Sequence, residues 1–149
     1  MSDPAKAANR RSNLPLVILA CLLAVSPAAC QPRHEPAMLA GGELPPEVMA
    51  AAQRVREAYA FAAANPDLMK EIPCYCGCGA IGHTSNYDCY VASVEGYGRI
   101  TYDLHALGCS VCVEITQDAM RLHEQGRSGA EIRAFIDARY GRYGPSNIP

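Results

Sequence analysis

Apolar residues recur at intervals of three and four in three stretches of the chain, and this period predicts three helices. The first stretch, residues 45–64, opens with two prolines, which suit a first helical turn, and it ends before the Asn65-Pro66 pair. Residues 67–72 add one or two helical turns at most. The stripe of the first helix consists of Val48, Ala52, Val55, Tyr59 and Ala62. The chain is therefore predicted to be helical from residue 45 almost to the point where its main group of cysteines begins.

Two more helices are predicted near the C-terminus. Residues 113–125 form the second helix, and Gly126 supplies its stop signal. Ser128 and Glu131 form a capping-box pattern, which opens the third helix at residues 129–140. The predicted stripes are Val113, Ile115 or Thr116, Met120 and His123 in the second helix, and Ile132, Phe135, Ile136 and Tyr140 in the third.

A β-hairpin is predicted between these helical regions. Residues 89–94 and 99–104 are rich in β-prone side chains, and they flank the glycine-containing turn sequence EGYG at residues 95–98. The predicted fold class is therefore α+β and mainly helical, a small cysteine-rich domain with three helices, a β-hairpin and a cysteine-rich loop.

The N-terminus has the pattern of an export signal. Lys6, Arg10 and Arg11 precede an apolar run at residues 14–25, which is too short to span a bilayer comfortably. Residues 27–30, PAAC, match a bacterial lipobox, in which Cys30 would carry the lipid. This pattern predicts a signal peptide at residues 1–29, a flexible tether at 30–44 and one domain at 45–149. The expected location is the cell envelope, with the domain outside the cytoplasm. An uncleaved membrane-anchoring helix remains the alternative.

Composition narrows the classes of function. The chain has 149 residues, a net charge of −2 and 19% charged residues, so it lacks the basic surface typical of nucleic-acid binding. It contains eight cysteines, two Phe and no Trp, and a core so poor in large side chains is usually reinforced by disulfides or metal. No Ser-His-Asp order, phosphate loop or paired-carboxylate motif is visible, which argues against a hydrolase or a nucleotide-dependent enzyme.

Six cysteines lie in the predicted domain, and their spacing favours a metal site. In an extended strand the alternate residues Cys74, Cys76 and Cys78 would lie about 6.6 to 6.8 Å apart, which is too far to share one ion. Gly77 and Gly79 would allow the backbone to curl and bring the sulfurs together. We expect the other half of the site to come from Cys89, Cys109 and Cys112, because C-x-x-C at a helix start is a common half-site.

Thiolates with an occasional imidazole select soft or borderline ions. His83 and His105 flank the cysteines and are the candidate imidazole ligands. Six cysteines exceed the four ligands of a single tetrahedral zinc, so a multinuclear Cu(I)–thiolate cluster fits the sequence better, with zinc as the other candidate. The leading hypothesis is an envelope lipoprotein that buffers, delivers or senses Cu(I).

Two alternatives stay open. Cys109 and Cys112 would act as an exchange-active pair in a thiol–disulfide oxidoreductase that serves haem or copper-site assembly. This is the one enzymatic role that the sequence favours. Alternatively, the six cysteines would form three disulfides, for which 15 connectivities exist, in a disulfide-stapled binding module. The expected partners are the membrane, through the lipid anchor, and a metalloprotein or redox protein.

The chain resembles two known families. The hexapeptide PCYCGC at residues 73–78, with Gly82-His83, Ser85-Asn86, Asp88-Cys89, His105 and GCSVC at 108–112, resembles the bacterial PCYCGC-motif lipoproteins over about residues 45–142. This resemblance implies an exported, lipid-anchored protein and leaves its chemistry undefined.

The second resemblance covers about 40 residues at the C-terminus. The same GCSVC, with Asp118, residues 126–128, EIR at 131–133 and RYG at 139–141, looks like the thiol-oxidoreductase subunit of bacterial cytochrome c maturation. It implies redox activity for Cys109 and Cys112. The chain departs from that family in lacking its downstream membrane helix, and the resemblance does not account for the cysteines between residues 74 and 89.

Overall fold

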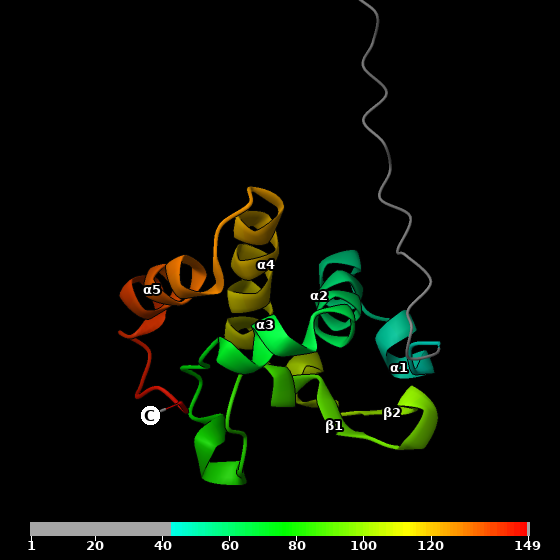
Figure 1. The fold of residues 1–149 in the computed structure, drawn as a ribbon. Helices are drawn as coiled ribbons and strands as arrows, with labels where there is room; N and C mark the ends of the chain where they lie inside the picture. The colour runs from blue at the N-terminus through cyan, green and yellow to red at the C-terminus, as the bar shows by residue number, and fades with distance from the viewer. Residues whose placement is uncertain (1–42, 149) are drawn as a thin grey trace, which may run out of the picture. The chain divides into compact units, whose positions relative to one another are not determined.

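The computed structural model describes residues 43–148, and the predicted signal peptide, Cys30 and most of the tether lie outside them. The helices are α1 (Pro46–Met49), α2 (Gln53–Ala64), α3 (Pro66–Glu71), α4 (Ser110–Glu124) and α5 (Gly129–Tyr140) (Figure 1). The strands are β1 (Val91–Val94) and β2 (Ile100–Tyr102), which pair as an antiparallel hairpin. The predicted fold class, α+β and mainly helical, is confirmed. No helix in the described part of the chain is long and apolar enough to cross a membrane.

The first predicted helix is wrong in one respect, because it is broken at residues 50–52. Ala52 adopts an extended backbone, and α2 begins only after it. The carbonyl of Ala51, which the break leaves without a helical partner, accepts a hydrogen bond from the guanidinium of Arg56. Helix propensity is a weak preference, and this side-chain contact with its surrounding packing outweighs it.

The second predicted helix is present as α4, but its buried face differs from the prediction. Met120 is half buried and His123 is exposed, whereas Ala119 and Leu122 are buried. The buried face is broad because α4 packs against α2 and against α5 (Figure 1). Gly126, with a φ of +76°, follows the end of α4 as predicted.

The third predicted helix is confirmed as α5. The Ser128 hydroxyl accepts the backbone N–H of Glu131, and the Glu131 carboxylate accepts the backbone N–H of Ser128, which completes the capping box. The predicted residues Ile132, Ile136 and Tyr140 are buried, and Phe135 packs against the core.

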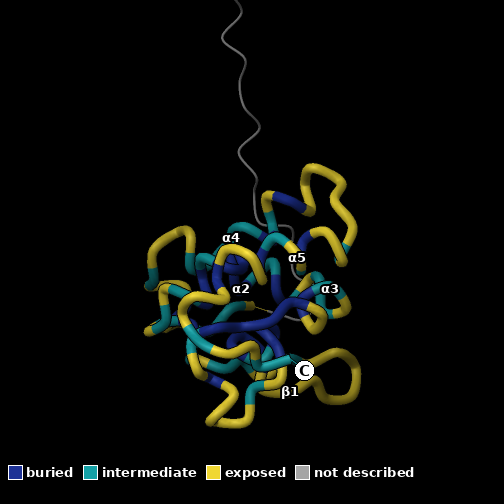
Figure 2. Tube along the Cα trace, turned by 90° about the vertical axis from the view of Figure 1, so that its left-hand side faces the viewer, coloured by how far each residue is buried: buried dark blue, intermediate teal, exposed yellow. Residues whose placement is uncertain are grey.

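The core lies where α2, α4 and the start of the hairpin meet. Figure 2 shows buried stretches meeting in the middle of the domain, with exposed turns around them. Tyr59 of α2 and Tyr90 are both fully buried and pack edge to face, with ring centroids 4.9 Å apart. Only Val91 of the first strand is buried, so the hairpin projects from this core with Tyr97 fully exposed at its tip.

Candidate metal centre

The site is built around residues 73–83, which we call the motif loop. Gly77 and Gly82 have positive φ angles of +85° and +96°, a conformation that favours glycine. The curl predicted at Gly77 is therefore confirmed. The curl predicted at Gly79 is wrong, because Gly79 has no positive φ and lies inside the short 3-10 helix Cys78–Ile81. A Cβ on Gly79 would lie 3.4 Å from the Asn147 Cβ, an ordinary contact, so this glycine packs beside the C-terminal tail.

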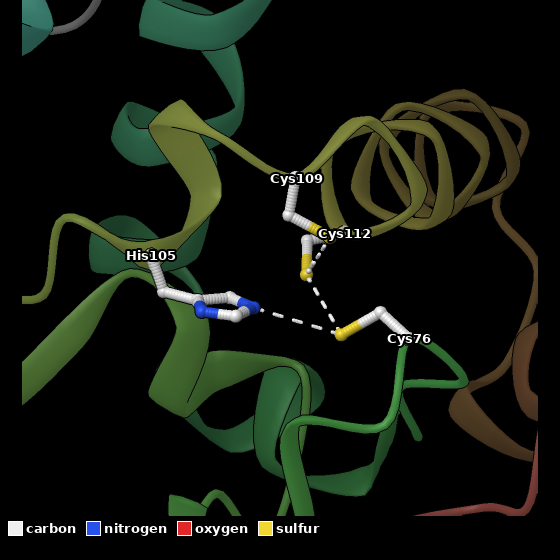
Figure 3. Close-up of side chains that lie close together, drawn as sticks. All are labelled: Cys76, His105, Cys109 and Cys112. Carbon is white, nitrogen blue, oxygen red and sulfur yellow. Dashed lines mark hydrogen bonds between the residues drawn. The ribbon is translucent and has the colours of Figure 1, made fainter.

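Two short 3-10 helices and the start of α4 bring the remaining donors to the motif loop. The 3-10 helix Tyr87–Cys89 carries Cys89, and the 3-10 helix His105–Leu107 carries His105. Cys109 is the N-cap residue of α4, and Cys112 lies in its first turn. Figure 3 shows Cys76 facing these two cysteines from the opposite side, with the His105 ring directed at the Cys76 sulfur.

The sulfurs form an unbroken series of contacts around Cys112. Its Sγ lies 3.1 Å from that of Cys109, 3.5 Å from that of Cys74 and 3.6 Å from that of Cys76. The Cys74 and Cys76 sulfurs are 3.4 Å apart. A disulfide is about 2.05 Å long, and all six described cysteines are free thiols. These separations are instead close to the edge of a metal–sulfur tetrahedron, about 3.8 Å for bonds near 2.3 Å.

A second set of contacts lies on the other side of Cys74. The Cys78 and Cys89 sulfurs are 3.7 Å apart, and Nδ1 of His83 lies 3.4 Å from the Cys89 sulfur. Nε2 of His83 lies 3.7 Å from Oδ2 of Asp103, which also accepts the backbone N–H of His105 through Oδ1. A carboxylate behind an imidazole is the usual support of a metal-binding histidine.

Nε2 of His105 lies 3.6 Å from the Cys76 sulfur, and its ring packs edge to face on that of His83, with centroids 5.1 Å apart. The cluster thus has two halves: the sulfurs that contact Cys112, and the set formed by Cys78, Cys89 and His83. The two imidazoles join these halves, and so does Cys74. All eight sequence-predicted donors come together in this cluster, whereas Cys30 lies outside the described residues.

Within the part of the chain that the structure describes, these donors form four groups whose ligand atoms lie within 4.8 Å of one another. Group 1 is Cys76, His105, Cys109 and Cys112. Group 2 is Cys78, His83, Cys89 and His105. Group 3 is Cys74, Cys76 and Cys78, and group 4 is Cys74, Cys89 and Cys112. Each group has the donor chemistry and the spacing to hold a metal ion.

Burial and mutual contact distribute the protons unevenly over the cluster. The S–H groups of Cys112 and Cys89 stabilise the thiolate of Cys74 and lower its pKa to about 2. The hydrogen bond of Cys112 to Cys74 raises the pKa of Cys112 in return. Burial, followed by the negative charge of Cys74, raises the pKa values of Cys76 and Cys78. In the metal-free cluster the thiolate is therefore favoured at Cys74, and the protonated thiol at Cys76, Cys78 and Cys112.

Asn147 is a site residue that the sequence reasoning missed. Its Oδ1 accepts the backbone N–H of Cys74 at 2.6 Å, and its backbone N–H donates to the Cys74 carbonyl at 3.2 Å. Its Nδ2 donates to the His83 carbonyl at 3.2 Å and faces the Cys78 sulfur at 3.7 Å. This side chain holds the motif loop between its first cysteine and its histidine. Figure 1 shows the tail beyond α5 returning to that loop.

A buried chain of hydrogen bonds fixes the first turn of α4. Asn86 donates to the Thr116 hydroxyl at 2.8 Å, Thr116 donates to the Tyr90 hydroxyl at 2.7 Å, and Tyr90 donates to the Cys112 carbonyl at 2.9 Å. All four residues are fully buried. This network connects the segment that carries Cys89 to the backbone of Cys112. It therefore helps to fix the position of Cys112 relative to Cys89.

A family model described as "Protein of unknown function with PCYCGC motif" matches residues 37–149, a range that includes all eight donors. No curated protein and no solved structure matches the chain.

Proposed function

The chain belongs to the family of proteins of unknown function with the PCYCGC motif, and we propose that it binds Cu(I) through its cysteine–histidine cluster. The observation that carries this proposal is the packing of six free thiols and two imidazoles into four contiguous groups. Because thiolates are soft ligands, such a donor set selects Cu(I), Zn(II) or an iron–sulfur cluster.

Coordination number favours copper over zinc. Structural zinc takes four protein ligands in a tetrahedron, and groups 3 and 4 supply three sulfurs each. Cu(I) forms stable complexes with two or three thiolates, so every group satisfies it. Zinc is the competing ion to be tested.

We propose that the cluster buffers, delivers or senses this ion at the cell envelope. The location follows from the N-terminal signal pattern and the lipobox cysteine, Cys30. Exchange of the ion with a partner metalloprotein requires access, and Cys76, Cys109 and both histidines are partly exposed. An open pocket of about 410 Å³ lies against His83 and Asp103, and it would admit a partner's ligand on that side.

Metal titration of the reduced, full-length protein under anaerobic conditions tests the proposal. Cu(I) is expected to bind in competition with a chelator of known affinity, to block the thiols against alkylation, and to displace Zn(II). The matched control is the same protein alkylated before metal is added. Failure of the reduced protein to take up Cu(I) from the chelator would contradict the proposal. Stoichiometric zinc that copper cannot displace would identify Zn(II), instead of Cu(I), as the bound ion.

Thiol–disulfide exchange is a second candidate, favoured by the pair at the start of α4. The Cys109 and Cys112 sulfurs are 3.1 Å apart, Cys109 is partly exposed, and Cys112 is fully buried. An accessible attacking thiol beside a buried resolving thiol suits exchange. Reduction of a model disulfide substrate by the metal-free protein, lost in Cys109→Ser and retained in Cys78→Ser, would support this activity.

A further inference from the structure

Building on the proposed Cu(I) binding, we infer that the cluster holds four Cu(I) ions joined by shared thiolates. One ion belongs to each of the four donor groups. The inference rests on how the groups overlap, which a count of the cysteines does not reveal.

Every pair of groups has one donor in common. Groups 1 and 3 share Cys76, groups 1 and 4 share Cys112, groups 3 and 4 share Cys74, groups 2 and 3 share Cys78, groups 2 and 4 share Cys89, and groups 1 and 2 share His105. Four points that are joined pairwise by six links are the corners and edges of a tetrahedron. The donor set therefore has the connectivity of a four-metal cage, with five of its six edges occupied by a sulfur that bridges two ions.

The two donors that are not shared complete the coordination of the ions in groups 1 and 2, the two groups that have His105 in common. Cys109 belongs to group 1 alone and His83 to group 2 alone. The group 1 ion is then held by Cys76, Cys109 and Cys112, and the group 2 ion by Cys78, Cys89 and His83. The other two ions are held by three bridging sulfurs each. His105, whose Nε2 lies 3.6 Å from the Cys76 sulfur, is an additional donor to the group 1 ion.

Charge favours filling all four positions. Six thiolates around a single Cu(I) would leave five negative charges in a cluster whose neighbouring sulfurs lie 3.1 to 3.7 Å apart. Four Cu(I) ions reduce this excess to two negative charges. The N-terminus of α4, at Cys109, and the amide of Asn147, facing Cys78, direct positive dipoles at the remainder. Because every pair of groups shares a donor, each bound ion also fixes one ligand of each of the other three positions, and we expect cooperative filling.

Counting the copper bound to the reduced, full-length protein by native mass spectrometry tests the inference. We expect saturation at four Cu(I), with metal-free and four-copper protein dominating at intermediate additions. X-ray absorption of the loaded protein is expected to show three-coordinate, mainly sulfur ligation and copper–copper scattering. Saturation at one or two ions, or the absence of copper–copper scattering, would overturn the four-metal cage and leave the proposed function standing. No uptake of Cu(I) would overturn both.

Two single substitutions separate shared from unshared sulfurs. Cys74→Ser removes a bridge between groups 3 and 4, whereas Cys109→Ser removes a ligand of group 1 for which His105 can substitute. We expect Cys74→Ser to lose cooperative four-copper binding and Cys109→Ser to retain four ions with weaker affinity. Equal losses in the two variants would contradict the cage. The counts on the unaltered protein test it even if Cys74→Ser fails to fold.

Discussion

Among single residues, Asn147 offers the sharpest test of how the chain tunes its sulfurs. Asn147→Asp keeps the oxygen that accepts the Cys74 N–H. It replaces the amide nitrogen, which donates to the His83 carbonyl and faces the Cys78 sulfur, with a second oxygen. A hydrogen bond to a charged group contributes about 1.5 to 3 kcal/mol, and about 1.4 kcal/mol corresponds to a tenfold change in affinity. We expect Cu(I) affinity to fall by about tenfold or more, as measured by chelator competition.

The matched control for this substitution is Asn65→Asp. Asn65 donates to the Phe61 carbonyl at the junction of α2 and α3, so the same change of charge is made away from the donors. Its copper affinity is expected to remain within a factor of about two. Equal weakening in both variants would mean that Asn147 acts only through net charge, and unchanged affinity in Asn147→Asp would remove its role in the cluster.

The protonation state of the thiols predicts how binding depends on pH. Cys76, Cys78 and Cys112 have pKa values raised above their ordinary value of 9.0, so each holds its proton below pH 9 and must release it to bind metal. Affinity for Cu(I) is therefore expected to rise steadily from pH 6 to pH 9, because protons compete less as the pH increases. Copper titration in a weakly buffered solution should also release acid. An affinity independent of pH would show that the thiols are already ionised.

The donors themselves could be predicted from the sequence, and their supporting residues could not. Cysteine and histidine have a specific metal-binding chemistry, and the eight donors are closely spaced between residues 74 and 112. The sequence alone therefore indicates that their side chains lie together in one site. Asn147 is an ordinary residue in a short tail, 73 positions from the backbone group that it binds. The prediction for Gly79 is wrong because this residue lies inside a 3-10 helix and has no positive φ.

Among the elements, the first turn of α4 is held by a buried chain of hydrogen bonds, and a substitution of Tyr90 tests the role of this chain. Tyr90→Phe removes the donor to the Cys112 carbonyl and one acceptor of the Thr116 hydroxyl, which can still donate to that carbonyl at 3.1 Å. The net loss of a hydrogen bond costs about 0.5 to 1.5 kcal/mol. We expect a loss of this size in the free energy of unfolding of the reduced, metal-free protein, measured by urea denaturation, together with weaker copper binding.

Tyr97→Phe is the matched control, because the same hydroxyl is removed from a side chain that is fully exposed at the hairpin tip. Its stability is expected to stay within about 0.5 kcal/mol of the unaltered protein. If Tyr90→Phe proved as mild as Tyr97→Phe, the hydrogen-bond chain from Asn86 to Cys112 would not be what fixes α4 against the motif loop.

The types of the secondary-structure elements could be predicted well from the sequence, whereas one helix boundary and the buried face of another helix could not. The capping box at Ser128 is a local signal that specifies its own helix start, and α5 follows it. The break at residues 50–52 has no local signal, since alanine is a good helix former and the competing contact comes from Arg56. The predicted face of α4 is wrong at Met120 and His123, because the sequence does not indicate that this helix packs on two others.

At the scale of the whole molecule, the cluster is the point where distant parts of the chain are held together. The motif loop, the segment of Cys89, the segment of His105 and the start of α4 all end at the same sulfurs and imidazoles. Those connecting segments contain little regular structure, and the core beside them is made largely of tyrosines and aliphatic residues. In a domain of this size, metal bound at the cluster would therefore contribute a large share of the folding free energy.

Removal of metal is accordingly expected to loosen the donor segments first. At free Cu(I) about a hundredfold above the dissociation constant, binding to the native state adds about 2.7 kcal/mol, which corresponds to a rise of about 10 °C or more in the melting temperature. Hydrogen exchange in the reduced, metal-free protein should accelerate at residues 74–89 and 105–112. Residues in α5, which is held by its own capping box and by packing on α4, should change far less. Uniform acceleration across both regions would mean that the metal stabilises the domain as one cooperative unit, and an unchanged melting temperature would mean that the ion does not bind the native protein in preference to the unfolded chain.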